Sequence, residues 1–192
     1  LSRRILSDVK EIIKKDKKGD FSYKISNTDR SVGANISGEI ASNYGEDGLS
    51  SNLNLHFSGS AGQSFGCWNA NGLNITLNGD ANDYVGKGMN GGKIIIKNDA
   101  DFAINDQKTI LAGNTCLYGA TGGEVYISGS VGERFAVRNS GAKAVIEGAG
   151  DHCCEYMTGG HVTILGGIGL NFAAGMTAVS YTHLTLPTRT VV

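Results

Sequence analysis

The sequence repeats one short unit over most of its length. From Leu53 to Thr177, each copy consists of a β-rich run, a glycine, a few polar residues and then Gly-Gly or Gly-Ala. Four of the five spacings between the glycines that end the runs are 16–20 residues, and the fifth, of 34 residues, holds an insertion around residues 97–108. Those glycines are Gly59, Gly79, Gly113, Gly129, Gly148 and Gly166. Repetition at a fixed short period is typical of a solenoid rather than of a globule with a central catalytic pocket.

The β-rich runs alternate apolar and polar residues, as Leu53, Leu55 and Phe57 illustrate. Alternation of this kind is typical of a half-buried strand with one inward face. A second column of residues follows the glycines, and it comprises Phe65, Val85, Cys116, Phe135, Cys153 and Phe172. Equivalent residues of a parallel solenoid lie about 4.8 Å above one another. Both columns therefore predict a continuous core that no single repeat could bury alone.

The first 50 residues lack the repeat. Ile5, Val9, Ile12 and Ile13 fall on one helical face, which predicts an amphipathic helix over Arg3–Lys15 with Gly19 as its stop. Alternation over 21–25 predicts a strand. Ser37 is the expected cap of a short helix that runs through Ile40 to Tyr44 and ends at Gly45. We expect residues 1–50 to form a cap on the open end of the repeats in 51–177.

Composition and charge exclude several classes of protein. Of the 192 residues 29 are glycine and one is proline, and the formal net charge is −1, so neither nucleic acid nor a membrane surface is an expected partner. No run approaches the ~18–20 apolar residues of a membrane span. The first residues are too charged for a signal peptide, so the four cysteines are expected to be reduced. Residues 178–192 do not continue the repeat, and we interpret them as a non-native tail.

Several long blocks of the chain resemble one family, the GXGXG domain at the C-terminus of the large chain of glutamate synthase. The blocks are NTDRSVGANISGEIASNYG (27–45), GSAGQSFGCW (59–68), GDANDYVGKGMNGGKI (79–94), GNTCLYGATGGE (113–124), GERFAVRNSGAKAVIEG (132–148), DHCCEYMTGG (151–160) and NFAAGMT (171–177). The resemblance covers about residues 1–177. It implies a right-handed, single-stranded parallel β-helix, which makes the expected fold all-β with a short α/β cap at the N-terminus.

The resemblance also implies what this chain does not carry. The parent enzyme makes glutamate from glutamine and 2-oxoglutarate; its glutaminase nucleophile is an N-terminal cysteine, and its FMN and 3Fe-4S cluster sit in the preceding synthase domain. None of those motifs occurs here, so no catalytic, cofactor-binding or metal residue is expected in this chain. The implied role is a brace that packs against the amidotransferase and synthase domains. A small subunit or ferredoxin is a further partner of the parent, and the implied location is the cytoplasm or a plastid.

Other functions stay open at this point. The domain occurs as a separate subunit in archaeal-type glutamate synthases, and a similar repeat occurs in a subunit of formylmethanofuran dehydrogenase; NTDRSVGA and the segment before Leu53 favour glutamate synthase. An extracellular carbohydrate-binding β-helix would want a row of exposed aromatic residues, and Trp68 is the only tryptophan.

Charged and polar residues within the glycine-rich pattern are the candidates for structural or interface roles. They are Arg30, Asp80, Asp83, Glu133, Arg134, Arg138 and Asn139. In a narrow solenoid such side chains must pair with one another or face outward. We therefore expect a ladder of ion pairs and amide hydrogen bonds between repeats, or contacts with a neighbouring domain. The run Asp151–Glu155 contains ligand-type residues, but adjacent Cys153 and Cys154 lack the C-x₂-C spacing of a zinc site. Glycine is usual in the family at Cys153, which predicts strain if φ is positive there.

Overall fold

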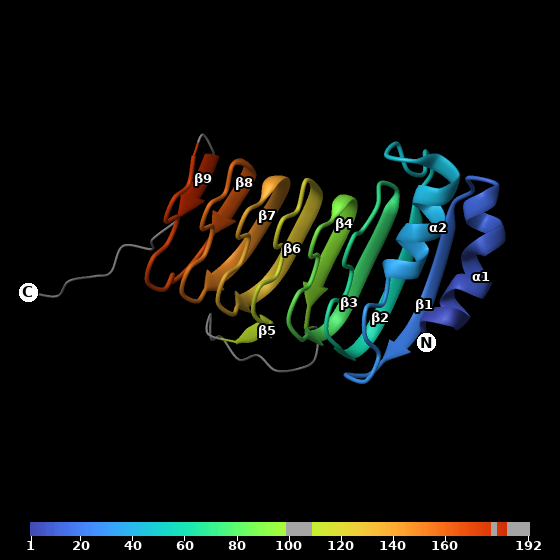
Figure 1. The fold of residues 1–192 in the computed structure, drawn as a ribbon. Coiled ribbons are helices and arrows are strands. Elements are labelled where there is room, and N and C mark those ends of the chain that lie inside the picture. Colours follow the sequence, from blue (N-terminus) through green and yellow to red (C-terminus); the bar gives the residue numbers. More distant parts are fainter. Residues whose placement is uncertain (99–108, 178–179, 184–192) are drawn as a thin grey trace, which may run out of the picture.

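The computed structural model describes residues 1–98, 109–177 and 180–183. Within these residues, two helices and nine strands follow one another (Figure 1). Their bounds are α1 Ser2–Lys14, β1 Gly19–Ile25, α2 Ala34–Tyr44, β2 Leu53–Ala61, β3 Leu73–Ala81, β4 Asn90–Lys97, β5 Ile110–Ala112, β6 Gly122–Val131, β7 Ser140–Ala149, β8 Gly159–Ile164 and β9 Ser180–His183. All strands form one sheet in the order β1-β2-β3-β4-β6-β7-β8-β9, with β5 paired to β3 and β6. Every pairing is parallel, so the architecture is a mostly parallel sheet with few helices.

The predicted alternation places two apolar rows inside the stack. Leu55 pairs with Ile75, and the row continues through Ile94, Val125, Ala144 and Val162. A second row begins at Phe57 and Leu77 and continues through Ile96, Ile127, Ile146 and Ile164. All of these side chains are buried. Because each large aliphatic side chain contributes about 1.5–3 kcal/mol when fully buried, the rows are the principal source of stability.

The pairing corrects the alignment of the repeats. Ala61 pairs with Ala81, Ala81 with Ala112, Ala112 with Val131 and Val131 with Ala149. Because Ala112 pairs with Ala81, Gly113 is equivalent to Asn82. We predicted that Gly113 is equivalent to Gly79, and that prediction is wrong by three residues. Glycine stands at several positions of the repeat, and for this reason glycine alone cannot set the register. The insertion lies largely at 99–108, outside the described residues.

The loops that join the strands stack on one another with an unusual backbone. In each loop every second residue has a positive φ, for example 60° at Arg134, 56° at Ala136 and 56° at Arg138. We call the stacked segments 64–68, 84–88, 115–119, 134–138, 152–156 and 171–175 the turn ladder, and each segment a rung. Each rung has a positive φ at its first, third and fifth residue.

Backbone hydrogen bonds join each rung to its neighbours. The Ala136 amide donates to the Cys116 carbonyl at 2.9 Å, and the Cys154 amide donates to the Phe135 carbonyl at 2.7 Å. Amides at the ends of a rung donate in the other direction, as Arg134 does to the Asp151 carbonyl at 2.8 Å. The predicted second column is confirmed, because its members occupy the second position of successive rungs. Cys153 is one of them, and its φ is not positive; the left-handed residues are its neighbours His152 and Cys154, at 63° and 61°.

The N-terminal elements join the stack rather than stand apart from it. Strand β1 pairs with β2 residue for residue, and α1 packs at the same end through Ile5, Val9 and Ile13, all buried (Figure 1). Ser31 and Gly33 have φ values of 51° and 104° and begin the ladder, since the Gly66 amide donates to the Val32 carbonyl at 2.9 Å. The proposed division at residue 50 stays a prediction.

Two expectations for the helix ends are wrong, while the end of α2 at Gly45 is confirmed. Ser37 does not cap α2, because the helix already begins at Ala34 after Gly33; Ser37 lies within it and is buried. Gly19 does not end α1, which stops at Lys14; it is the first residue of β1. Gly33, with a φ of 104°, occupies the N-cap position that we predicted for Ser37.

The C-terminal end carries one further strand. Strand β9 pairs with β8, from His161 opposite Ser180 to Ile164 opposite His183. Residues 178–179 and 184–192 of the predicted tail lie outside the described residues, and its foreign origin stays a prediction.

Candidate functional site

Metal-ligating side chains do not cluster in the part of the chain that the structure describes, although His152 Nδ1 lies 2.6 Å from Glu155 Oε1 on one rung. Within residues 1–98, 109–177 and 180–183, no three His, Cys, Asp or Glu side chains are grouped to hold a metal ion. All four cysteines are free and buried. Their arrangement does not fit an iron–sulfur cluster, which needs several thiolates around one point.

The adjacent pair Cys153 and Cys154 is the densest group of reactive side chains. Their Sγ atoms lie 3.6 Å apart, and both side chains are fully buried. The neighbouring Cys154 thiol, together with burial, raises the pKa of Cys153. Burial also raises the pKa of Cys116 to about 12. Because the thiolate is the reactive form, the raised pKa values of Cys153 and Cys116 lower the reactivity of these two thiols.

The seven sequence candidates occupy different places. Arg30, Glu133, Arg134 and Arg138 are exposed, and none of the seven forms an ion pair with another in the described residues. Asp80 is exposed and accepts a hydrogen bond from the Ser60 hydroxyl at 2.7 Å. The structure therefore supplies hydrogen bonds between repeats, and it does not bring the seven together at one place.

Asp83 and Asn139 both fix the backbone. The Asp83 carboxylate accepts from the amide of Asn114, the residue just before the next rung, at 2.7 Å. Asn139 is fully buried; its Nδ2 donates to the Ala142 carbonyl at 3.0 Å, and its Oδ1 accepts from the Gly141 and Ala142 amides at 3.2 and 2.9 Å. Their roles are local to the stack.

Sequence reasoning missed three residues of the same kinds. Asn114 Oδ1 accepts from the Glu133 amide at 2.8 Å, and Asp151 Oδ1 accepts from the Leu170 amide at 2.7 Å. Asn69 is buried like Asn139, and its Nδ2 donates to the Leu73 and Gly91 carbonyls. A signal was present: Asp83, Asn114 and Asp151 each stand two residues before a member of the second column.

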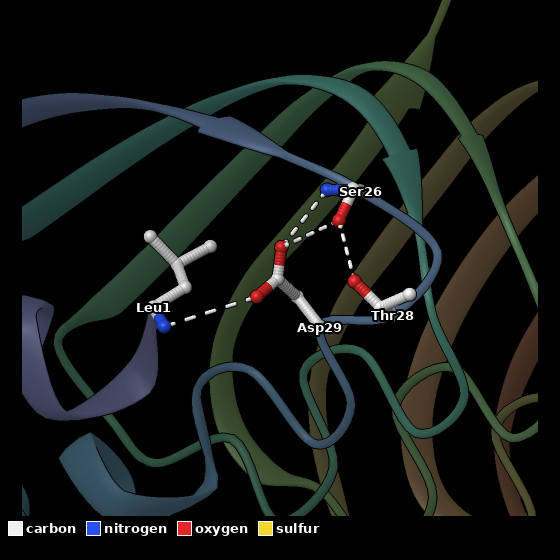
Figure 2. Close-up of polar contacts among 4 residues, drawn as sticks. All are labelled: Leu1, Ser26, Thr28 and Asp29. Atoms are coloured by element: carbon white, nitrogen blue, oxygen red, sulfur yellow. Dashed lines mark hydrogen bonds and ion pairs between the residues drawn. The ribbon is translucent and has the colours of Figure 1, made fainter.

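The block NTDR forms a tight turn directly before Ser31, where the ladder begins (Figure 2). The Asp29 carboxylate accepts from the amide and the hydroxyl of Ser26 at 3.0 and 3.1 Å, and the Ser26 and Thr28 hydroxyls are 2.8 Å apart. The Leu1 amine lies 3.8 Å from the same carboxylate. Asp29 is thus a turn-forming residue, and neighbouring Arg30 extends into solvent.

A groove of about 480 Å³ lies between α2 and the loop that joins β2 to β3. Helix α2 contributes Ala34, Ser37, Gly38 and Ala41, and the opposite wall includes Trp68, whose side chain is 59% exposed. The Ser37 hydroxyl is buried without a hydrogen-bond partner. The groove thus combines an apolar hollow, an exposed aromatic ring and an unpaired polar atom.

These features define a class of protein: a parallel repeat domain whose strands and connecting turns both stack from one repeat to the next. The family model described as "GXGXG motif" matches residues 2–183. The chain therefore belongs to the GXGXG family. No helix of the described residues is long and apolar enough to cross a membrane.

Comparison with curated proteins finds similar regions in glutamate synthases. The chain is 55% identical over 145 residues to ferredoxin-dependent glutamate synthase 2 of Synechocystis, covering 76% of the chain and 9% of that protein. It is 53% identical over 149 residues to the Bacillus subtilis glutamate synthase [NADPH] large chain, covering 77% and 10%. It is 53% identical over 179 residues to the chloroplastic ferredoxin-dependent enzyme of spinach, covering 92% and 11%. The chain spans about a tenth of the length of the curated relatives it matches.

Proposed function

We propose that this chain is the non-catalytic GXGXG domain of a glutamate synthase, an oxidoreductase that makes glutamate from glutamine and 2-oxoglutarate. The single observation that carries the proposal is the unbroken stack, hydrogen-bonded on both its strand side and its turn side from β1 to β8. The sequence identities to glutamate synthases indicate which enzyme this domain belongs to. A separate subunit of the archaeal or formylmethanofuran dehydrogenase type is not favoured, because the relatives reported above are long glutamate synthases.

The proposed fold is a right-handed, single-stranded parallel β-helix with residues 1–50 as its cap and 51–177 as its repeats. Parallel in-register strands joined by stacked turns support it. Bending such a stack between two repeats would break hydrogen bonds on the strand side and the turn side together. A stack of this kind is therefore stiff along its axis.

The proposed role is to hold two reaction sites at a fixed distance. Ammonia released from glutamine must reach the synthase site before it escapes into solvent, so the amidotransferase and synthase domains need a constant separation. FMN and the 3Fe-4S cluster belong, in this proposal, to the synthase domain, and ferredoxin or a small subunit supplies the electrons. The proposed location is the cytoplasm or a plastid.

The test uses the full-length Bacillus subtilis large chain with its GXGXG region replaced by residues 1–177 of this chain. Coupling is measured as glutamine hydrolysed per 2-oxoglutarate converted. We expect the chimera to couple as the parent does and a variant without the region equivalent to 53–177 to hydrolyse excess glutamine. Flavin and cluster absorbance control for loss of the synthase domain. Tight coupling in the truncated enzyme, with both absorbances intact, would refute the bracing role.

A further inference from the structure

We propose that the groove between α2 and Trp68 is the docking site for an apolar α-helix that belongs to the same synthase polypeptide but lies outside the GXGXG domain. This inference rests on the proposed function and names the surface through which the bracing acts. It draws on three independent features of the groove: its small-residue helix face, its unpaired hydroxyl and its exposed indole.

The first feature is a row of small residues on α2. Ala34, Gly38, Ala41 and the C-cap Gly45 follow one another at helical spacing and all line the groove. Gly38 has no reason within the chain to be glycine, because its φ is not positive and a Cβ added there would meet nothing within 4 Å. Glycine is among the poorest helix formers. Its presence in mid-helix permits another backbone to approach closely.

The second feature is the Ser37 hydroxyl. The Ser37 residue is only 3% exposed and lines the groove, and its Oγ has no hydrogen-bond partner. Buried polar atoms without partners are rare because they lose their hydration without compensation. A segment in the groove that offered a carbonyl or side-chain oxygen would accept this hydrogen bond.

The third feature is Trp68. Its φ is 56°, a left-handed conformation that bulky residues rarely adopt. Three of the five equivalent rung positions carry glycine (Gly88, Gly119 and Gly175), and the other two carry Arg138 and Tyr156. The indole lies against Gly88, where a Cβ would be 2.9 Å from Trp68 Cδ1. A large ring is thus kept in a strained backbone conformation and still leaves 59% of its surface exposed. Tryptophan is the residue type most enriched among the energetic centres of protein interfaces.

The shape and polarity of the groove favour a helix as its occupant. A row of small side chains leaves a shallow groove on one helix, and the side-chain ridge of another helix can pack into it at close range. The exposed lining is mainly apolar although Glu46, Asn71 and Asn90 contribute to it, so the contacting face of the occupant is expected to be mainly apolar. The matched relatives are about ten times longer than the region they share with this chain, so in those enzymes most of the polypeptide is available to supply the helix.

The experiment places a photo-crosslinking benzoylphenylalanine at residue 68 of the full-length chimera described above. Tyr126 on β6 is the control position, because it is also aromatic and is 37% exposed. We expect residue 68 to crosslink to a peptide outside the GXGXG domain, identified by mass spectrometry. Gly38→Leu, which fills the groove, is expected to reduce that crosslink at least tenfold, whereas Gly38→Ala reduces it less.

The isolated chain tells blocked docking apart from misfolding. Because space is open at Gly38, both Gly38→Ala and Gly38→Leu are expected to melt at or above the temperature of the unmodified chain. A lower melting temperature for both would show that the groove is closed by the chain itself and would overturn the inference.

Three crosslinking outcomes contradict the proposal in different ways. Crosslinks from residue 126 but not from residue 68 would place docking elsewhere and leave the bracing role intact. Crosslinks between two copies of this domain would assign the groove to self-association. The absence of a crosslink from both positions, together with tight coupling in the truncated enzyme, would overturn both this inference and the proposed function.

Discussion

Replacing an exposed arginine of the turn ladder by glycine should stabilise the protein. Arg134 and Arg138 are exposed and have φ values of 60° and 56°. A left-handed conformation costs about 1–2 kcal/mol for a residue with a Cβ. Glycine avoids that cost but loses about 0.5–1 kcal/mol through its greater freedom in the unfolded chain. The difference predicts a gain of about 0.5–1 kcal/mol in the free energy of unfolding for Arg138→Gly or Arg134→Gly.

A matched control variant should change the free energy of unfolding in the opposite direction. Lys24 is also basic and exposed, but it lies in β1 with an ordinary φ, so Lys24→Gly should lower stability by about 0.5–1 kcal/mol. The assay is urea unfolding followed by circular dichroism, with thermal melting as a second measure. For a chain of this size the expected rise in Tm for each arginine variant is about 1–4 °C. If Arg138→Gly and Lys24→Gly destabilise the chain equally, the left-handed ladder is not the source of strain that we infer.

Three further results are expected. Asn139→Ala should cost about 2–3 kcal/mol in urea unfolding, because it leaves the buried Ala142 backbone without its partners; a loss below about 0.5 kcal/mol would contradict this account. The pKa of Asp16 is lowered chiefly by the hydrogen bond from the Ser51 backbone amide. The ionised carboxylate therefore stabilises the fold above its unfolded pKa of about 3.9, and this stabilisation is lost as the pH falls through the folded pKa. The stability gap between the unmodified chain and Asp16→Asn should therefore be present at pH 7 and close below about pH 4, as pH-dependent urea titrations would show. Ellman's reagent at pH 8 should label no thiol of the native chain and all four in denaturant; rapid labelling of Cys116 in the folded chain would contradict its burial.

The sequence predicts the strand side of the repeat well. Alternation at Leu53, Leu55 and Phe57 recurs in every long run, and a period of two has only one interpretation when one face must be buried. The second column was also found, because Phe65 and Phe135 are large enough to mark the inside of a turn. Apolar residues recur at equivalent positions because each repeat packs against an equivalent repeat.

The turn side was much less predictable. Only five of the eighteen left-handed rung positions carry glycine, so glycine spacing does not reveal the ladder. Residues such as Leu117 and Trp68 adopt φ values of 59° and 56° because two neighbouring rungs fix their backbone by hydrogen bonds. That constraint is tertiary, and no local pattern around either residue encodes it. The groove beside Trp68 was missed for the same reason, since α2 and this rung meet only in the folded chain.

The two sides of the stack also differ in how their exposed side chains are satisfied. On the strand side polar residues pair with the next strand, as Asn74 does with Asn54 at 3.1 Å and Lys93 with Glu124 at 3.1 Å. On the turn side Trp68 and Tyr156 are more than half exposed, and neither has a polar partner in the described residues. Strained conformations persist only where the surroundings impose them, and they gather at sites of binding. Because Trp68 and Tyr156 expose large rings on the turn side, burying them against another domain would bring a gain there, and the groove at α2 lies beside Trp68.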